Sequence, residues 1–154
     1  MSKLLSFLVL CFLLCQQISA TTLSFVSDGA VYTFQSGQKV EAVIPAEISL
    51  DWPTMYGSNW IWDKTDNVTP GVALFMRFFT VPGIPTKSYI TISGDDNFTI
   101  FLNGRLVAMK SETSHFLTEI DMLSKTVQGD NYLHIIVDNN LGLGGLLFKA
   151  AIEY

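Results

Sequence analysis

The sequence predicts an all-β protein, a single-domain β-sandwich that follows a cleaved N-terminal signal peptide. Three observations support this prediction. Short runs of alternating apolar and polar residues recur along the chain, and glycine, asparagine and proline residues separate them. About eight to ten such runs, with turns roughly every 8–12 residues, are typical of a sandwich or barrel. The third observation is an apolar leader at the N-terminus, which indicates export.

The clearest strand pattern lies between residues 90 and 107. Ile90 and Ile92 alternate with polar neighbours, and Gly94–Asn97 interrupts the alternation with residues that accept turn geometry. Asn103-Gly104 is a strong hairpin signal, because a type I′ turn needs positive φ at both central residues. We therefore expect three antiparallel strands in this stretch, joined by turns at 94–97 and 103–104.

Residues 1–20 have the features of a secretory signal peptide. Lys3 gives a positive start, the run from Leu4 to Cys15 is almost entirely apolar, and the segment ends on the small residue Ala20. The alternative is an uncleaved membrane anchor, but a spanning helix needs about 20 apolar residues and the run is shorter. We expect cleavage after Ala20, a domain over residues 21–154, secretion to the extracellular space and no stable membrane insertion.

Removal of the leader changes the composition of the chain. Both cysteines, Cys11 and Cys15, lie in the leader, so the expected domain has no disulfide and must be stabilised by its core. The whole chain has a net charge of −5, and the leader contains one lysine and no acidic residue. An acidic domain argues against nucleic acid and anionic membranes as partners, since both require basic patches.

Before residue 71 the pattern predicts short strands and one irregular loop. Strands are expected at residues 23–25, 31–34 and 40–44. Asp28-Gly29 is expected to form a hairpin turn between the first two strands. Residues 51–60 contain Pro53 and Gly57 and are expected to be irregular. Trp60 and Trp62 alternate, which predicts both indoles on one side of a short strand.

The second half of the chain contains longer predicted strands. Residues 72–81 are apolar on both faces, which predicts a central strand, and Arg77 within it is expected to pair with a carboxylate. Residues 116–125 fit either a helix or a strand; the β context favours a strand at 115–120 with a helical turn at 121–124. Strands at 132–137 and 146–154 complete the fold.

Five segments occur in an informative order along residues 60–154. They are Trp60-Ile-Trp62, the long apolar strand Ala73–Val81, the Asp-Asp and Asn-Gly pairs of 92–104, the Gly-Asp-Asn start of 129–139, and Gly144-Gly-Leu-Leu147. In this order they resemble the galactose-binding-domain-like jelly rolls. These domains occur as carbohydrate-binding modules and as accessory domains of secreted glycosidases. The resemblance implies a two-sheet jelly roll and says less about function, because one sandwich hosts many functions.

Asp95, Asp96 and Asn97 place several oxygen atoms on one turn. A calcium ion takes about six to eight oxygen ligands, and the resemblance implies a structural calcium ion here or contact of both aspartates with a ligand. Preference for turn geometry alone explains the same three residues. Asn97-Phe98-Thr99 is also a glycosylation sequon, as is Asn67-Val68-Thr69, which Pro70 follows.

The aromatic residues near the irregular loop are the other ligand candidates. Aromatic side chains bind sugar rings by covering their apolar face. Trp52 and Tyr56 lie within the loop and are candidates for ligand binding, with packing as the alternative. Trp60 and Trp62 are expected to pack in the core.

The sequence contains no convincing catalytic set. Asp95 and Asp96 are neighbours on a turn, so they are poorly placed to face each other across a glycosidic bond. No serine lies in a nucleophile elbow, and His115 and His134 are the only histidines. We therefore expect a non-catalytic module that binds carbohydrate, such as a glycan at a cell surface or in the extracellular matrix. The alternative is a structural or adhesive protein that makes protein–protein contacts, which a flat exposed apolar sheet face would favour.

Overall fold

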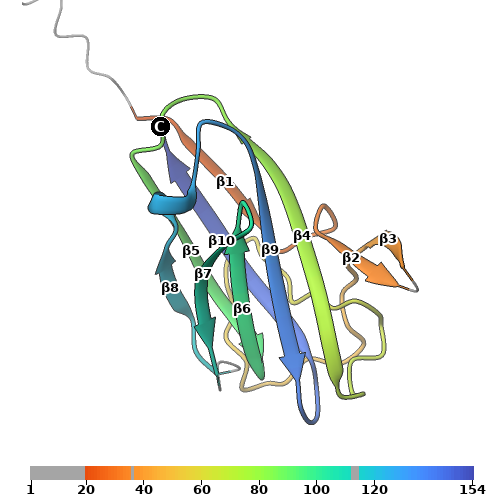
Figure 1. Cartoon of the computed structure of the whole chain (residues 1–154). Helices are drawn as coiled ribbons and strands as arrows, with labels where there is room; N and C mark the ends of the chain where they lie inside the picture. Colours follow the sequence, from red (N-terminus) through yellow and green to blue (C-terminus); the bar gives the residue numbers. More distant parts are fainter. Residues whose placement is uncertain (1–19, 36, 112–114) are drawn as a thin grey trace, which may run out of the picture.

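The computed structural model describes residues 20–35, 37–111 and 115–154, which form two β-sheets packed face to face (Figure 1). The strands are β1 (Thr22–Val26), β2 (Tyr32–Gln35), β3 (Gln38–Glu41), β4 (Gly71–Val81), β5 (Lys87–Asp95), β6 (Asn97–Leu102), β7 (Arg105–Lys110), β8 (Thr118–Asp121), β9 (Gly129–Asn139) and β10 (Gly145–Glu153). A short 3-10 turn, η1 (Leu123–Lys125), follows β8. The predicted signal peptide lies almost wholly outside the described residues.

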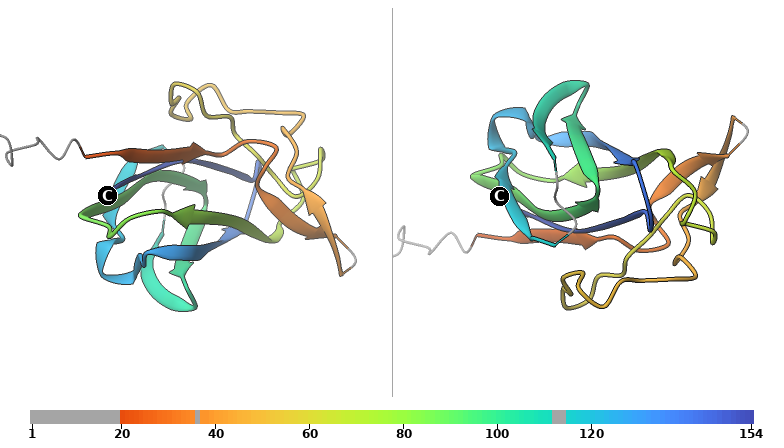
Figure 2. Two further views of the ribbon diagram at one scale, coloured as in Figure 1. Left: turned by 90° about the horizontal axis from the view of Figure 1, so that it is seen from above. Right: turned by 90° about the horizontal axis from the view of Figure 1, so that it is seen from below.

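The two layers differ in size. Sheet A has four strands in the order β1-β10-β5-β8, and sheet B has six in the order β3-β2-β4-β9-β6-β7. All registered pairings are antiparallel. Figure 2 shows the layers from above and below. The all-β, two-sheet architecture agrees with the fold class that the sequence predicts.

The structure contradicts the prediction that the turn at 94–97 joins two neighbouring strands of one sheet. β5 and β6 are not hydrogen-bonded to each other: β5 lies between β10 and β8 in sheet A, and β6 lies between β9 and β7 in sheet B. The chain therefore crosses from one sheet to the other at Asp95–Asp96. The second turn is the predicted hairpin, since β6 pairs with β7 and both Asn103 (φ 53°) and Gly104 (φ 73°) have positive φ.

The predicted hairpin at Asp28-Gly29 is wrong for a similar reason. β1 belongs to sheet A and β2 to sheet B, so this connection also joins the two layers. The predicted ion pair of Arg77 is confirmed here: its Nη1 donates to Oδ1 of Asp28 at 2.9 Å. The pair ties the crossing segment to β4 in the centre of sheet B.

Trp60 and Trp62 do not lie on one side of a strand. Trp62 packs in the core against Phe75, with ring centroids 5.8 Å apart, whereas Trp60 packs with Trp52 in a separate cluster. The prediction fails because residues 60–62 form only isolated bridges, Ile61 with Leu146 and Trp62 with Val43. Farther along the chain, β8 followed by η1 confirms the predicted strand and helical turn.

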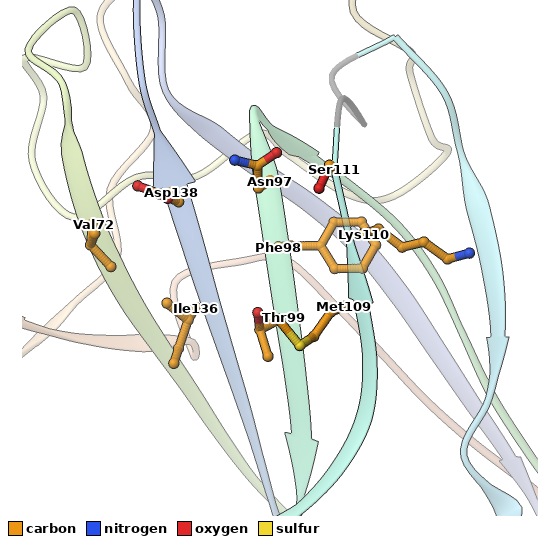
Figure 3. Close-up of a pocket in the computed structure, with 9 residues that line it drawn as sticks. All are labelled: Val72, Asn97, Phe98, Thr99, Met109, Lys110, Ser111, Ile136 and Asp138. Carbon is orange, nitrogen blue, oxygen red and sulfur yellow. The ribbon is translucent and has the colours of Figure 1, made fainter.

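The outer face of sheet B is unusually apolar for an exposed surface. The sequence predicts that β4 is covered on both faces, but Val72 and Phe78 are exposed on its outer side. A groove of about 340 Å³ lies on this face where β4, β9, β6 and β7 run side by side (Figure 3). The second apolar side of β4 therefore contributes to a surface and not to the core.

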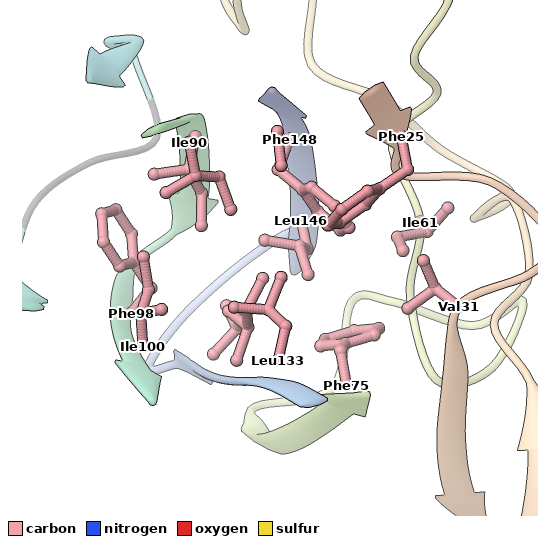
Figure 4. Close-up of a cluster of buried hydrophobic side chains, with 14 of the residues drawn as sticks. Phe25, Val31, Ile61, Phe75, Ile90, Phe98, Ile100, Leu133, Leu146 and Phe148 are labelled. Atoms are coloured by element: carbon pink, nitrogen blue, oxygen red, sulfur yellow. The ribbon is translucent and has the colours of Figure 1, made fainter. Parts of the chain in front are cut away.

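The core fills the space between the inner faces of the two sheets (Figure 4). Its large, fully buried side chains come from both layers and include Phe75 and Phe98 from sheet B and Ile90, Ile92 and Phe148 from sheet A. Complete burial of one such side chain contributes about 1.5–3 kcal/mol. This core provides the stability that a domain without disulfides needs.

Candidate functional site

The long connection between β3 and β4 forms a pocket on the outer side of sheet A. Trp52 and Trp60 stack there with ring centroids 4.2 Å apart, and Leu147 of β10 packs against them. The two indoles are 6% and 5% exposed, and Trp60 Nε1 donates to the Pro53 carbonyl oxygen at 3.0 Å. We call the adjoining cavity of about 350 Å³ the indole pocket, and it is lined by Ile48, Ser49, Leu50, Trp52, Thr54, Met55, Ser58, Asn59, Trp60 and Leu147.

Gly145 allows the stacked indoles to approach the sheet. A Cβ atom at this position would lie 2.7 Å from ring carbons of both Trp52 and Trp60. Real Cβ atoms do not approach side chains that closely, so any other residue would displace the indoles. The absence of a side chain at the start of β10 therefore shapes the base of the pocket.

Ser58 supplies a free polar group beside the two rings. Its hydroxyl is buried and, within the described residues, has no hydrogen-bond partner. A buried hydroxyl without a partner costs about 1–3 kcal/mol relative to one that is hydrogen-bonded. Ser58 also lines the indole pocket, so a ligand hydroxyl group that displaces the atoms covering the Ser58 hydroxyl would satisfy it. Apolar rings with a few polar groups are typical of small-molecule sites.

Asp95 lies behind Trp52 at the end of β5. The side chain is 8% exposed and hydrogen-bonds to Asp96 and to Trp52, whose only side-chain donor is the indole N–H. Burial, reinforced by the hydrogen bond and the charge of Asp96, raises the pKa of Asp95 to about 7. Trp52 acts in the opposite direction. Asp95 is therefore about half protonated at neutral pH, and its protonated form can donate to Asp96.

Asp96 has the opposite environment. Burial alone would raise its pKa, but hydrogen bonds from Asp95 and from residues 140 and 141 outweigh that effect and lower it. The Asn140 backbone N–H donates to Asp96 Oδ2 at 2.8 Å. The cis peptide between Asp95 and Asp96 lies between these two carboxyls. The pair thus links the crossing turn to the β9–β10 loop, with Asp96 as the charged partner.

The predicted ligand residues do not form one site. Trp52 and Asp95 are in contact, and Trp52 is a largely buried residue that also lines the indole pocket. Tyr56 is 96% exposed and does not line the indole pocket. Asn97 lies on the other layer and lines the groove of sheet B. Asp96 turns toward the β9–β10 loop.

The calcium prediction gains no support from this geometry. No group of three or more His, Cys, Asp or Glu side chains among the described residues is placed to hold a metal ion. Asp95 and Asp96 are hydrogen-bonded to each other, which requires a proton on one of the two carboxyls. A cation bound by both carboxylates would have to displace that proton. The calcium site remains a prediction.

Among the residues of the indole pocket that sequence reasoning missed are Trp60 and Ser58. Trp60 is expected in the core, but it packs outside sheet A. The position of Trp52 and Trp60 at opposite ends of one Pro- and Gly-containing loop is a signal that could have suggested their contact. Ser58 has no such signal, because the burial of a loop serine depends on the path of the whole loop.

The fold is shared with parts of sugar-cleaving enzymes. A β-glucuronidase from Ruminococcus gnavus matches with a TM-score of 0.59 and 13% identity, over 89% of this chain and 29% of the enzyme. An α-L-rhamnosidase from Streptomyces avermitilis, in complex with L-rhamnose, matches with a TM-score of 0.54 and 19% identity, over 91% of this chain and 13% of the enzyme. No protein-family model and no curated protein sequence matches the chain.

These similarities show that the β-sandwich fold of this chain also occurs within glycosidases. At this identity they show the fold alone, and the chain spans less than a third of either enzyme. The resemblance to galactose-binding-like jelly rolls is therefore supported at the level of architecture. Within the described residues, no helix has the length and apolar character required to cross a membrane.

Proposed function

We propose that this protein is a secreted, non-catalytic carbohydrate-binding module whose ligand enters the indole pocket. The observation that supports this most strongly is the pairing of a buried, unpartnered Ser58 hydroxyl with two stacked indoles around one cavity. A sugar presents the matching chemistry, since its ring has an apolar face and a rim of hydroxyl groups. The occurrence of the fold within glycosidases agrees with this ligand class.

The lining of the pocket favours binding over catalysis. Its described lining residues include no acidic, basic, histidine or cysteine side chain. Glycoside hydrolysis usually requires two carboxyl groups on opposite sides of the scissile bond. The nearest such candidates, Asp95 and Asp96, bind each other at the turn behind Trp52.

A glycan array probed with the secreted protein tests this proposal. We expect intact mass to show a chain that begins at Thr21, and we expect a restricted set of glycans to be bound. Two of the three tryptophans line the pocket and Trp62 lies in the core, so binding should change the intrinsic fluorescence. Incubation with the same glycans should release no sugar. An array without any bound glycan would contradict the proposal.

A second candidate function is protein–protein contact through sheet B. The exposed apolar residues on its outer face favour this function; they are Phe34, Val72, Phe78, Leu106, Met109 and Tyr132. Exposed apolar patches of this kind mark interaction sites. The occupant would be a partner protein with a complementary apolar surface. Phe78→Glu should abolish capture of such a partner and leave glycan binding unchanged.

A further inference from the structure

The two glycosylation sequons lie in opposite environments. Asn67 is 1% exposed, and its Nδ2 donates to the carbonyl oxygens of Glu47 and Gly144, each at 2.9 Å. A sugar on this nitrogen would replace one of these hydrogen bonds and occupy the interior of the fold. The geometry therefore argues against a glycan on Asn67. Asn97, in contrast, is partly exposed at the first position of β6.

Asn97 stands at one end of the groove on sheet B. In the sheet register it lies opposite Asp138 of β9, and Thr99, the third residue of its sequon, lies opposite Ile136. Figure 3 shows Asn97 beside Asp138, with Thr99, Met109 and Ile136 farther along the same face. Both the acceptor asparagine and the threonine of the sequon therefore face the groove.

The groove combines an apolar floor with polar groups at one end, which suits contact with a sugar. Its apolar part includes Val72, Ile136 and Met109, and Met109 is 66% exposed. Asn97 and Asp138 supply polar groups at its end. An N-acetylated sugar can place its apolar ring face and acetyl methyl on such a floor and direct its hydroxyl groups to the polar end. The volume of about 340 Å³ is in the range of small-ligand sites.

We propose that Asn97 is N-glycosylated and that the first sugars of its glycan lie in this groove, where they cover one end of the exposed apolar face of sheet B. The donor is a lipid-pyrophosphate-linked oligosaccharide of the secretory pathway. A bond forms between Asn97 Nδ2 and the anomeric carbon, and the bond from that carbon to the pyrophosphate oxygen breaks. The amide nitrogen loses one proton, and the lipid pyrophosphate leaves with the bonding electron pair. This inference rests on the secretion that the proposed function includes.

Intact mass spectrometry of protein from glycosylating cells tests the modification, with medium and lysate both measured. Wild type, Thr99→Ser and Thr69→Val should each carry one glycan, because all three keep the Asn97 sequon. Thr99→Val and Asn97→Gln should lack it. Unmodified wild-type protein in either fraction, or loss of the glycan in Thr69→Val, would overturn the proposal. Glycosylated protein that stays in the lysate would support glycosylation of Asn97 and would contradict only the proposed secretion.

Oxidation of methionine tests where the glycan lies. Met109 lines the groove, whereas Met55 lies in the loop over the opposite sheet and serves as an internal reference. The rate of Met109 oxidation relative to Met55 should be several-fold slower in glycosylated wild type than in Asn97→Gln. Equal relative rates would show that the glycan points into solvent and would overturn its placement in the groove.

Discussion

The rings of Trp52 and Trp60 stack with their centroids 4.2 Å apart, against a position of β10 where Gly145 provides no side chain. This relationship attaches the loop between β3 and β4 to the outer side of sheet A. It also depends on Gly145, because a Cβ there would lie 2.7 Å from both indoles. The indole pocket therefore requires glycine at residue 145.

Gly145→Ala should disrupt the pocket. The new methyl group must push the indoles from the sheet, and overpacking of this kind costs about 1–3 kcal/mol of unfolding free energy. Glycan affinity should fall together with stability. Chemical denaturation of the variant measures the loss of unfolding free energy. Gly29→Ala is the matched control, because nothing lies within 4 Å of its added Cβ. Equal stability of the two variants would contradict the packing described for Trp52 and Trp60.

Asp95 should make the stability of the fold depend on pH. Its pKa is raised from 3.8 to about 7 on folding, so the folded chain holds this proton more tightly than the unfolded chain. The stabilising contribution is fully present below pH 3.8 and is lost as pH rises through 7. The lowered pKa of Asp96 affects the stability of the fold only below pH 3.8, so it does not overlap with the effect of Asp95 near pH 7.

Asp95→Asn should remove the loss of stability that wild type shows as pH rises through 7. The amide can still donate to Asp96 but does not titrate, so the variant should match wild type near pH 5 and exceed its stability at pH 8–9. Unfolding free energies across this range, measured with a chelator present, check the prediction. A constant stability difference between the two proteins at every pH would exclude a raised pKa for Asp95.

The Asn103–Gly104 hairpin should tolerate no β-branched residue at its second position. Gly104 has a φ of 73°, and an added Cβ would also lie 3.3 Å from the Tyr132 hydroxyl oxygen. Gly104→Val should cost on the order of 1–3 kcal/mol. Gly71→Val is the control, since an added Cβ meets nothing within 4 Å at that strand position. Similar thermal midpoints for the two variants would show that the turn does not need positive φ.

Local features of this fold could be predicted from the sequence, whereas the pairing of strands could not. The Asn103-Gly104 turn is determined by its own residues, so the β6–β7 hairpin is correct. The alternation of apolar and polar residues along a strand indicates which side of the strand is buried, but it does not indicate which sheet the strand joins. For that reason the connections at Asp28–Gly29 and Asp95–Asp96 are wrongly predicted as turns within one sheet.

The same holds for the candidate site: single residues could be predicted from the sequence, but the contacts between them could not. Trp52 and Asp95 are identified as notable residues, but their contact depends on how a long irregular loop crosses the outer side of sheet A. The raised pKa of Asp95 comes mainly from burial, which a turn-forming residue pair does not indicate. β4 is apolar on both sides, yet one side is exposed, because no element of the described chain covers the outer face of sheet B.

The most direct test of carbohydrate binding in the indole pocket is the affinity of Ser58→Ala for the best glycan from the array, measured by titration calorimetry. Ser124→Ala, an exposed serine on η1, is the control. We expect Ser58→Ala to bind about tenfold more weakly, since one buried hydrogen bond contributes roughly 1–1.5 kcal/mol. Its stability without glycan should equal or exceed that of wild type, because the unpartnered hydroxyl is removed. Full affinity in Ser58→Ala would contradict binding in this pocket.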